Sequence, residues 1–349
     1  MSELKIGGKK VGGKNPCFVI AEAGSNHNRK LSQAKKLIDV AVEAGADAVK
    51  FQTYSAESLY SKKTKKMKYL EKITSEKQSV WDLIKAIEMP REWQSKLSKY
   101  CKKKGIIFLS TPFDLKAVDE LAALKVPAYK MASFEMLDTV LLKHAAKKKK
   151  PMILSTGMAS MAEVKEAVRT VKSTGNKKIA LLHCSIGYPP PFKDVNLNAI
   201  KTMQKTFPGI PIGYSDHTMS IAIPAAAVAL GAKIVEKHFT LSRKLKGPDH
   251  PFALEPSELK AMVKGIRETE QSLGTGNKKL MASEREMHKL ARRSVVSATD
   301  IPKGTKIIRK MLTTKRPGYG IAPKFFEKLI GKKAKRNIEE DEVLTWKVV

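Results

Sequence analysis

The amino-acid sequence predicts a (β/α)₈ barrel over residues 1–280, a linker over residues 281–293 and a small β-rich domain over residues 294–349. In the first part of the chain, short apolar runs rich in β-branched residues alternate with segments of helical period, which is typical of repeated βαβ units and a parallel sheet. After the helical segment ELKAMVKGIRETEQSLG (residues 258–274) this alternation stops. The change of pattern marks the boundary between a barrel and a second domain.

Eight segments have the composition of buried strands, and eight is the number that closes a barrel. An open doubly wound sheet would alternate in the same way, but its first strand should lead into a glycine-rich turn, and AEAGSNHN (residues 21–28) stands there instead. The closed barrel is therefore favoured. The eight segments are residues 17–24, 48–52, 106–111, 128–133, 152–157, 179–184, 211–217 and 233–239.

Helical segments separate these strands, and residues 31–45 (LSQAKKLIDVAVEAG) show the pattern well. Their apolar residues recur at spacings of three and four, and a glycine ends the segment. The sequence of the tail predicts short strands over residues 294–304, 305–321 and 336–349, with a helix around residues 323–334. So small a module is expected to be docked on a larger body.

The formal charge is +32, from 66 Lys and Arg against 34 Asp and Glu. A field of this sign attracts anions, including nucleic acids and phosphorylated substrates. Lysine runs such as residues 147–150 lack the interleaved aromatic residues of single-strand binders and belong to no groove-reading motif. Solvated helix faces are therefore favoured over a specific nucleic-acid site.

A cytoplasmic location is expected. The first ten residues, MSELKIGGKK, lack the apolar core of a signal peptide, and the most apolar stretch, residues 221–232, is too short to span a bilayer. The three cysteines, Cys17, Cys101 and Cys184, are widely spaced and odd in number, which favours reduced thiols over a disulfide framework or a zinc site.

Polar side chains stand at or just beyond the end of every candidate strand, where barrel enzymes place their catalytic groups. A single such residue is explained by strand capping, but the recurrence on eight strands is not. The residues are Glu22, Asn26, His27, Lys50, Gln52, Ser110, Thr111, Lys130, Ser133, Glu135, Ser155, Thr156, Cys184, Ser185, Tyr188, Ser215, Asp216, His217, Glu236 and His238.

Two lysines and several hydroxyl groups in this set can hold an anion that carries a phosphate and a carboxylate, which requires several converging charge-assisted donors. The sequence has no P-loop, so ATP is not indicated. The residues of this cradle are Lys50, Thr111, Lys130, Ser133, Ser155 and Ser215.

His217 and His238 end neighbouring strands, within reach of one metal ion. Either histidine alone could be a hydrogen-bonded structural residue, but the pair, with Asp216 and Asp249 close in sequence, favours metal binding. Imidazole ligands completed by carboxylate or water suit manganese or a related divalent ion. No third protein ligand is evident, which implies open coordination positions for water or substrate.

An ordered set of motifs resembles the sialic acid synthase family. The tail, with SVV, DIPKGT and KRPGYGI in that order, resembles the C-terminal antifreeze-like (β-clip) domain of the same family, so that the resemblance covers nearly the whole chain. The barrel motifs are AEAGSNHN, AVKFQ, FLSTPFD, YKMASFE, ILSTGM, LLHCSIGYP, GYSDHT, ALGAKIVEKHFTL and GPDHPFALEP.

The resemblance implies a TIM barrel in a domain-swapped homodimer and a metal-dependent condensation of phosphoenolpyruvate with N-acetylmannosamine. Water adds, phosphate leaves, and a nine-carbon 2-keto acid is formed. A legionaminic acid synthase acting on a diacetamido-hexose is the alternative, ahead of a pseudaminic acid synthase. The motif around Glu135, SFE, favours the legionaminic or pseudaminic branch, whereas GPDH (residues 247–250) argues against the pseudaminic one.

The resemblance also assigns roles to individual residues. His217 and His238 would hold the divalent ion, with Mn²⁺ expected before Mg²⁺ or Co²⁺. Glu135, Glu22, Lys130 and Tyr188 would act in catalysis, and Arg316 would reach from the partner subunit to the N-acyl group of the substrate. Phosphoenolpyruvate would contact Lys50, Thr111, Lys130, Ser133, Ser155 and Ser215, and the sugar would contact Glu22, Gln52, Glu135, Tyr188 and Asp249.

One departure and two rival functions stay open. The family usually has glycine where Arg29 follows Asn28, so the turn either tolerates a side chain or is reshaped. Lys130 or Lys50 could instead be the Schiff-base lysine of an aldolase. The high charge and the antifreeze-like tail also allow a nucleic-acid-binding or ice-binding module, although a fold does not imply a function.

Overall fold

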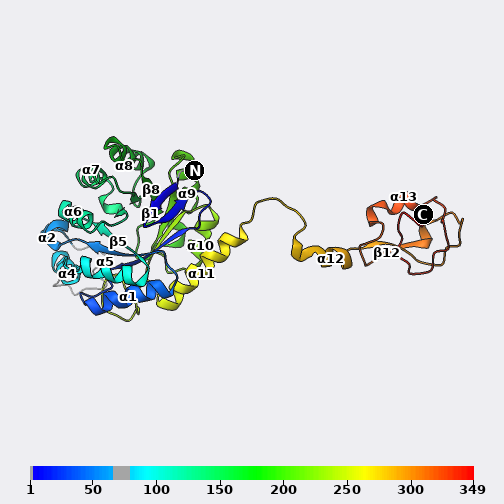
Figure 1. The fold of residues 1–349 in the computed structure, drawn as a ribbon, viewed down its shortest axis with the longest axis horizontal. Coiled ribbons are helices and arrows are strands. Elements are labelled where there is room, and N and C mark those ends of the chain that lie inside the picture. Colours follow the sequence, from blue (N-terminus) through cyan, green and yellow to red (C-terminus); the bar gives the residue numbers. More distant parts are fainter. Residues whose placement is uncertain (1–2, 66–78) are drawn as a thin grey trace. The chain divides into compact units, whose positions relative to one another are not determined.

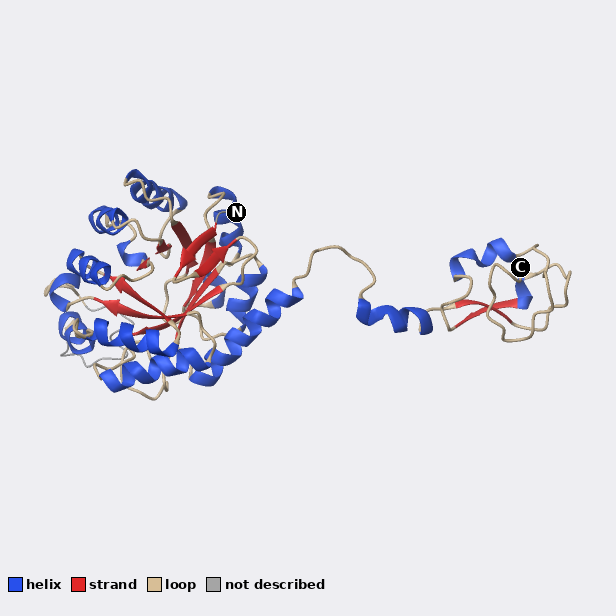
Figure 2. Cartoon of the chain, viewed as in Figure 1, coloured by secondary structure: helices blue, strands red, loops and turns tan. Residues whose placement is uncertain are grey.

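The computed structural model describes residues 3–65 and 79–349, and the chain divides into two compact units, Met1–Gly274 and Thr275–Val349. In the first unit an inner sheet is surrounded by helices (Figures 1 and 2). Among the described residues, no helix is long and apolar enough to cross a membrane.

Eight parallel strands form the inner sheet in the order β5-β4-β3-β10-β9-β8-β7-β6. The two end strands of this order, β5 and β6, also lie next to each other, so the sheet curls into a barrel. The predicted barrel is thus confirmed, and each predicted strand segment overlaps one observed strand. The strands are β3 (Phe18–Gly24), β4 (Ala48–Thr53), β5 (Ile107–Pro112), β6 (Tyr129–Met131), β7 (Met152–Ser155), β8 (Ile179–Cys184), β9 (Ile212–Asp216) and β10 (Ile234–His238).

Local signals explain where several helices begin and end. Ser160 accepts a hydrogen bond from the Glu163 N–H, and Glu163 accepts one from the Ser160 N–H, which forms a capping box at the start of α8. Gly105 ends α5 with a φ of 75°. The helices of the first unit are α1 (Leu31–Glu43), α2 (Ala56–Leu59), α4 (Val80–Ile87), α5 (Trp93–Lys104), α6 (Leu115–Ala123), η1 (Ser133–Glu135), α7 (Thr139–Lys147), α8 (Met161–Ser173), η2 (Phe192–Asp194), α9 (Asn198–Thr206), α10 (Ala222–Ala229) and α11 (Pro256–Ser272).

A β-hairpin of β1 (Glu3–Ile6) and β2 (Lys9–Gly12) precedes the barrel and was not among the predicted strands. Its two-residue loop, Gly7-Gly8, has positive φ at both positions, as a tight hairpin turn requires. A Cβ on Gly7 would lie 2.6 Å from Ile107 Cδ1, so the turn also needs glycine for space. The pair Gly-Gly between alternating residues is a hairpin signal that the sequence carries.

The hairpin packs its apolar face on the inward-facing residues at one end of the barrel. Leu4, Ile6 and Val11 share one buried cluster with Phe18 and Ile20 at the start of β3. Because β3 enters the barrel at this end, the hairpin lies against the N-terminal ends of the strands. The other inward members of the cluster are Ile107, Leu109, Ala128, Ile153, Ala180, Leu182, Ile234 and Ala48.

The second unit is small and holds its own buried cluster. The antiparallel pair β11–β12 and the helical turn η5–α13 lie in predicted segments, whereas residues 336–349 contribute isolated bridges at Ile338 and Val343 in place of a named strand. Its elements are η3 (Ala282–Glu284), α12 (Arg285–Leu290), β11 (Ser294–Ser297), η4 (Arg309–Met311), β12 (Leu312–Lys315), η5 (Pro323–Phe325) and α13 (Phe326–Leu329).

We predict that Ile6→Ala lowers the free energy of unfolding by about 2–5 kcal/mol, because it opens a cavity at a fully buried position between the hairpin and the barrel. Urea unfolding followed by circular dichroism measures the change. Lys5→Ala, at the exposed neighbouring position of the same strand, is the matched control and should change the value by less than about 0.5 kcal/mol. Equal effects of the two substitutions would contradict the role assigned to the hairpin.

Candidate active site

The inward-facing positions change from apolar to polar along the strands that supply the apolar cluster beneath the hairpin. On β10, for example, Ile234 lies in the apolar cluster, whereas Glu236 and His238 follow it on the same face, since alternate residues of a strand share a face. The polar layer therefore lies at the C-terminal ends of the strands, where barrel enzymes hold their sites. It contains Glu22, Lys50, Gln52, Thr111, Lys130, Ser155, Cys184, Ser215, Glu236 and His238, with His217 directly after β9.

Two buried lysines and two buried carboxylates form the centre of this layer. Lys50 Nζ lies 2.8 Å from Glu22 Oε2 and donates to Thr111 Oγ1 at 3.0 Å. Glu236 approaches both lysines, at 3.2 Å from Lys130 Nζ and 3.7 Å from Lys50 Nζ. The lysines of the predicted anion cradle are thus brought together and are held in place by carboxylates.

Burial and the charges of the neighbouring lysines shift the pKa values of these two carboxylates in opposite directions. Burial raises the pKa of Glu22 to about 7, against the opposing attraction of Lys50. Burial also acts to raise the pKa of Glu236, but the charges of Lys130 and Lys50 outweigh it, so this pKa lies below its ordinary value. At neutral pH Glu236 is therefore ionised, whereas Glu22, with a pKa of about 7, is ionised in only about half of the molecules, so the carboxylates do not fully offset the lysines.

The three serines of the predicted cradle lie at the end of β7 and β9 and just after β6. Ser133 accepts a hydrogen bond from the Gly157 N–H at 2.9 Å, and Ser215 donates to Glu236 Oε1 at 3.0 Å. The Ser155 hydroxyl is buried and has no hydrogen-bond partner within the described part of the chain. A buried hydroxyl without a partner is costly unless a ligand or a water molecule satisfies it, so Ser155 is available to a substrate.

The two histidines lie side by side, as predicted. Their ring centroids are 5.2 Å apart, and both side chains are buried. Burial lowers the pKa of His217 to about 4 and that of His238 well below its ordinary value, so both rings are neutral at pH 7 and offer lone pairs to a cation. His238 Nδ1 has no hydrogen-bond partner in the described residues and lies 3.9 Å from Asp249 Oδ2. The donor set fits a divalent ion bound by two imidazoles.

Asp216 does not join this pair, although its place in the sequence suggested it. Lys237 and Asp216 occupy the opposite face of their strands, where Lys237 Nζ lies 2.5 Å from Asp216 Oδ2. The Thr218 N–H also donates to Asp216, at 2.9 Å. The residues 3–65 and 79–349 contain no group of three or more His, Cys, Asp or Glu side chains that could hold a metal ion.

The residues that are predicted to contact the sugar lie in the same polar layer or at its edge. Glu135, in η1, is buried, one of its oxygens has no hydrogen-bond partner among residues 3–65 and 79–349, and burial raises its pKa to about 7. Gln52 Nε2 donates to Glu22 Oε1 at 2.8 Å. The Tyr188 ring packs edge-on against His217, with centroids 4.9 Å apart. Burial also raises the pKa of Asp249, to about 6.

Arg316 belongs to the second unit, where it directly follows β12 and its side chain is exposed. All the other predicted site residues belong to the first unit. The contribution of Arg316 from a partner subunit stays a prediction.

The turn that carries Arg29 keeps a left-handed backbone with a side chain in place. Asn28 has a φ of 47° and Arg29 a φ of 53°. The Arg29 N–H donates to His27 Nδ1 at 3.0 Å, and the Arg29 guanidinium donates to the Lys85 carbonyl at 3.0 Å. Of the two readings left open by the sequence, the structure shows the one in which the turn tolerates a side chain.

Glu236 and Cys184 were named as polar strand ends without a role, and the structure places both in the centre of the layer. Glu236 joins the two lysines, and Cys184 Sγ lies 3.7 Å from His217 Nδ1. The signal for Glu236 was its spacing of two from His238, which puts both on one face of a strand. No pattern in the sequence pointed to a contact between Cys184 and His217.

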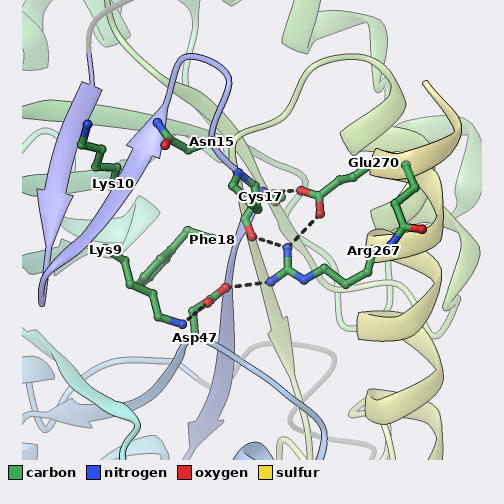
Figure 3. Close-up of a pocket in the computed structure, with 10 residues that line it drawn as sticks. Lys9, Lys10, Asn15, Cys17, Phe18, Asp47, Arg267 and Glu270 are labelled. Carbon is green, nitrogen blue, oxygen red and sulfur yellow. Dashed lines mark hydrogen bonds and ion pairs between the residues drawn. The ribbon is translucent and has the colours of Figure 1, made fainter. Parts of the chain in front are cut away.

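A separate pocket of about 730 Å³ lies at the other end of the barrel, between the hairpin and α11 (Figure 3). Its charged groups neutralise one another: Arg267 pairs with Asp47 at 3.0 Å and with Glu270 at 3.1 Å, and donates to the Cys17 carbonyl at 2.8 Å. Lys9 also pairs with Asp47. The hairpin, the start of β3 and α11 line this pocket, which lies away from the polar layer.

Comparison with known proteins finds sugar acid synthases that are similar to this chain over nearly its whole length. N,N'-diacetyllegionaminic acid synthase of Campylobacter jejuni is 44% identical over 329 residues, 94% of this chain and 98% of its own. Human N-acetylneuraminate-9-phosphate synthase is 39% identical over 343 residues, 98% of this chain and 95% of its own. The crystal structure of the spore coat polysaccharide biosynthesis protein SpsE of Bacillus subtilis has 41% identity and a TM-score of 0.69, and the match covers 100% of this chain and 99% of that one.

Two family models match the chain in sequence. That of the NeuB family covers residues 37–278, and that of the SAF domain covers residues 292–349. Both matches confirm the family predicted from the motifs. The chain therefore belongs to the NeuB family, and its C-terminal unit carries a SAF domain.

Proposed function

We propose that this enzyme condenses phosphoenolpyruvate with the aldehyde of an N-acetylated mannose-type sugar, adds water, releases phosphate and yields a nine-carbon 2-keto acid. Membership of the family of sugar acid synthases makes the chain an enzyme of the transferase type that uses phosphoenolpyruvate. The observation that carries the proposal is the juxtaposition of two buried lysines and their hydroxyl partners with two neutral, buried histidines in one layer.

Phosphoenolpyruvate is held by the cradle in this proposal. Its phosphate and carboxylate need several positive or hydroxyl donors at once, and Lys50, Lys130 and Ser155 supply them without long side-chain rearrangement. Thr111, Ser133 and Ser215 complete the set.

His217 and His238 hold the divalent ion, which we expect to be Mn²⁺, with Mg²⁺ or Co²⁺ as alternatives. When bound, such an ion supplies Lewis-acid polarisation of the sugar aldehyde. The cradle meanwhile fixes the methylene carbon of phosphoenolpyruvate for attack on that aldehyde. A carbon–carbon bond forms, the π bond of the aldehyde breaks, and the aldehyde oxygen takes up a proton to become a hydroxyl group. The positive charge left on the central carbon of the former enol is then captured by water.

Glu135 accepts the proton from this water. The carboxylate is buried, one of its oxygens has no partner within the described residues, and its pKa of about 7 suits a base that works near neutral pH. The tetrahedral intermediate expels inorganic phosphate, whose charge Lys50 and Lys130 stabilise. Glu22, Gln52, Tyr188 and Asp249 face the sugar, and Arg316 of a partner subunit in a homodimer contacts its N-acyl group.

The sugar that we propose first is the 2,4-diacetamido mannose-type precursor of a legionaminic acid, with N-acetylmannosamine second. The identity of 44% to a legionaminic acid synthase, against 39% to the human enzyme, supports this order, as does the SFE motif around Glu135. It reverses the order that the family resemblance implied, in which N-acetylmannosamine came first.

A Schiff-base aldolase is the second candidate, because burial lowers the pKa of Lys130, as a nucleophilic lysine requires. Its pairing with Glu236 at 3.2 Å instead suits a fixed cation. Borohydride reduction in the presence of substrate decides between them: a covalent adduct at Lys130 would establish the aldolase and exclude the condensation proposed here.

We predict that the purified enzyme with Mn²⁺ and phosphoenolpyruvate releases phosphate fastest with the 2,4-diacetamido mannose-type sugar, more slowly with N-acetylmannosamine, and least with the altrose-type precursor. A phosphate-release assay with mass spectrometry of the product measures this. Faster release with N-acetylmannosamine would reverse the order of sugars, and no release with any of them would refute the proposed reaction.

We predict that chelation of the divalent ion, or His217→Ala, lowers kcat by roughly 10³-fold or more, because Lewis-acid stabilisation is worth several kcal/mol. Added Mn²⁺ should restore the chelated wild type but not the variant. His144→Ala, a substitution of a histidine that pairs with Asp119 in the helical layer, is the matched control and should keep full activity. A wild-type rate that survives chelation would remove the metal from the mechanism.

We predict that kcat/KM falls about tenfold per pH unit below pH 7, because Glu135 with a pKa of about 7 must be ionised to act as a base. Glu135→Gln should lose roughly 10²–10⁴-fold in rate and should lose this acid limb. Glu22 also has a pKa of about 7, so Glu22→Gln is the control and should keep the limb. An unchanged limb in Glu135→Gln would assign it to another group.

A further inference from the structure

One hydrogen bond joins Ser133 and Gly157, which follow the ends of two neighbouring strands. Ser133 begins η1 after β6, and Gly157 lies two residues beyond the end of β7, with which β6 pairs in parallel. The Gly157 N–H donates to Ser133 Oγ at 2.9 Å, and both residues are buried. The bond therefore lies at the C-terminal ends of the strands, where the predicted anion cradle is.

The direction of this bond is fixed, because a backbone N–H can only donate. The Ser133 oxygen accepts through a lone pair, so its hydroxyl hydrogen points away from Gly157 and can be donated to another group. A hydroxyl group whose oxygen accepts a hydrogen bond is also polarised by it, which strengthens its own donation. Ser133 is thereby prepared to donate to an anionic oxygen.

The peptide unit between Thr156 and Gly157 is held at both of its polar ends. Its N–H donates to Ser133, and its carbonyl oxygen accepts from the Ala159 N–H at 3.3 Å. Thr156 is fixed in turn, since its own N–H and its hydroxyl both donate to the Leu182 carbonyl of β8, each at 3.0 Å. The N–H of Gly157 therefore has a set direction before any ligand binds.

Glycine is required at residue 157 for space. Its φ lies outside the left-handed region, so backbone conformation alone would permit a side chain. A Cβ, however, would lie 2.6 Å from Ile186 Cγ1 and 2.8 Å from Ser133 Oγ. Relief of the second clash turns the Ser133 hydroxyl away, so even alanine is incompatible with the hydrogen bond.

We propose that Gly157 is a positioning residue of the anion cradle: its N–H holds the Ser133 oxygen, so that the hydroxyl hydrogen is directed at an anionic oxygen of phosphoenolpyruvate. This inference rests on the proposed function, which places Ser133 in the cradle. Ser155, two residues earlier, has a buried hydroxyl without a hydrogen-bond partner in the described residues. One strand end then supplies a direct donor, Ser155, and the group that orients a second donor.

Calorimetric titration of the full chain with phosphoenolpyruvate, without sugar, tests this role in an Ile186→Ala background, which removes the clashing Ile186 atoms. We expect added Gly157→Ala to weaken binding by about 10–100-fold, the range for a lost hydrogen bond to a charged group, and Ser133→Ala to have a similar effect. Gly265→Ala, in α11 with open space around its Cβ, is the matched control and should leave binding unchanged.

The double variant separates positioning from a general effect on packing. If Gly157 acts through Ser133, Gly157→Ala should weaken binding by less than about threefold more once Ser133→Ala is present. Unchanged binding in Gly157→Ala, or effects of the two substitutions that multiply, would overturn this inference alone. A wild type that does not bind phosphoenolpyruvate would instead refute the proposed function.

Glycine-selective NMR gives a second readout that leaves Gly157 in place. Labelling with ¹⁵N-glycine and carbonyl-¹³C-threonine selects the glycines that follow threonine, among them Gly157, Gly175 and Gly276. In Ser133→Ala the Gly157 amide proton should shift upfield because it loses its acceptor, while Gly175 and Gly276 serve as internal controls and should not move. An unchanged Gly157 resonance would show that the hydrogen bond does not exist in solution and would overturn the inference.

Discussion

The pairing of two lysines with two carboxylates inside the barrel is the constraint on which the rest of the site depends. Removing an ammonium group from water costs several kcal/mol, and it is tolerated only when an opposite charge and hydrogen bonds compensate. Glu236 meets this need for Lys130, and Glu22 and Thr111 meet it for Lys50. The carboxylates thereby hold the two ammonium groups at fixed positions in a buried layer, so that an anion can bind there without a rearrangement of the lysine side chains.

The barrel makes this layer possible by separating it from the apolar core along each strand. The first inward residues are apolar and are covered by the N-terminal hairpin, so the apolar side chains of the barrel interior are gathered at one end. The inward residues at the other end are then free to be polar. Lys237 and Asp216 are each one position away from these inward residues, so their side chains point to the outer face of the strands. They form an ion pair there and take no part in the site.

The two histidines depend on the same layer in a different way. Burial keeps both rings neutral, so they do not repel the lysines and are able to act as metal ligands. Cys184 on β8 lies beside His217 and is in register with Ser215, which is in register with Glu236 beside the lysines, so the anion cradle and the candidate metal pair are neighbours in one layer.

The sequence by itself determined the barrel, because strand length, alternation and eight repeats are local properties that a chain displays without its fold. It also determined most of the polar layer, since the end of each strand can be located from composition, and the resemblance of its motifs named the family. Whether Asp216 or Glu236 faces the lysines depends on the phase of each strand relative to its neighbours, and only the tertiary structure fixed it. The same holds for the contact between Cys184 and His217: their strands are neighbours, but a distance between two side chains is set by the curvature and register of the closed sheet.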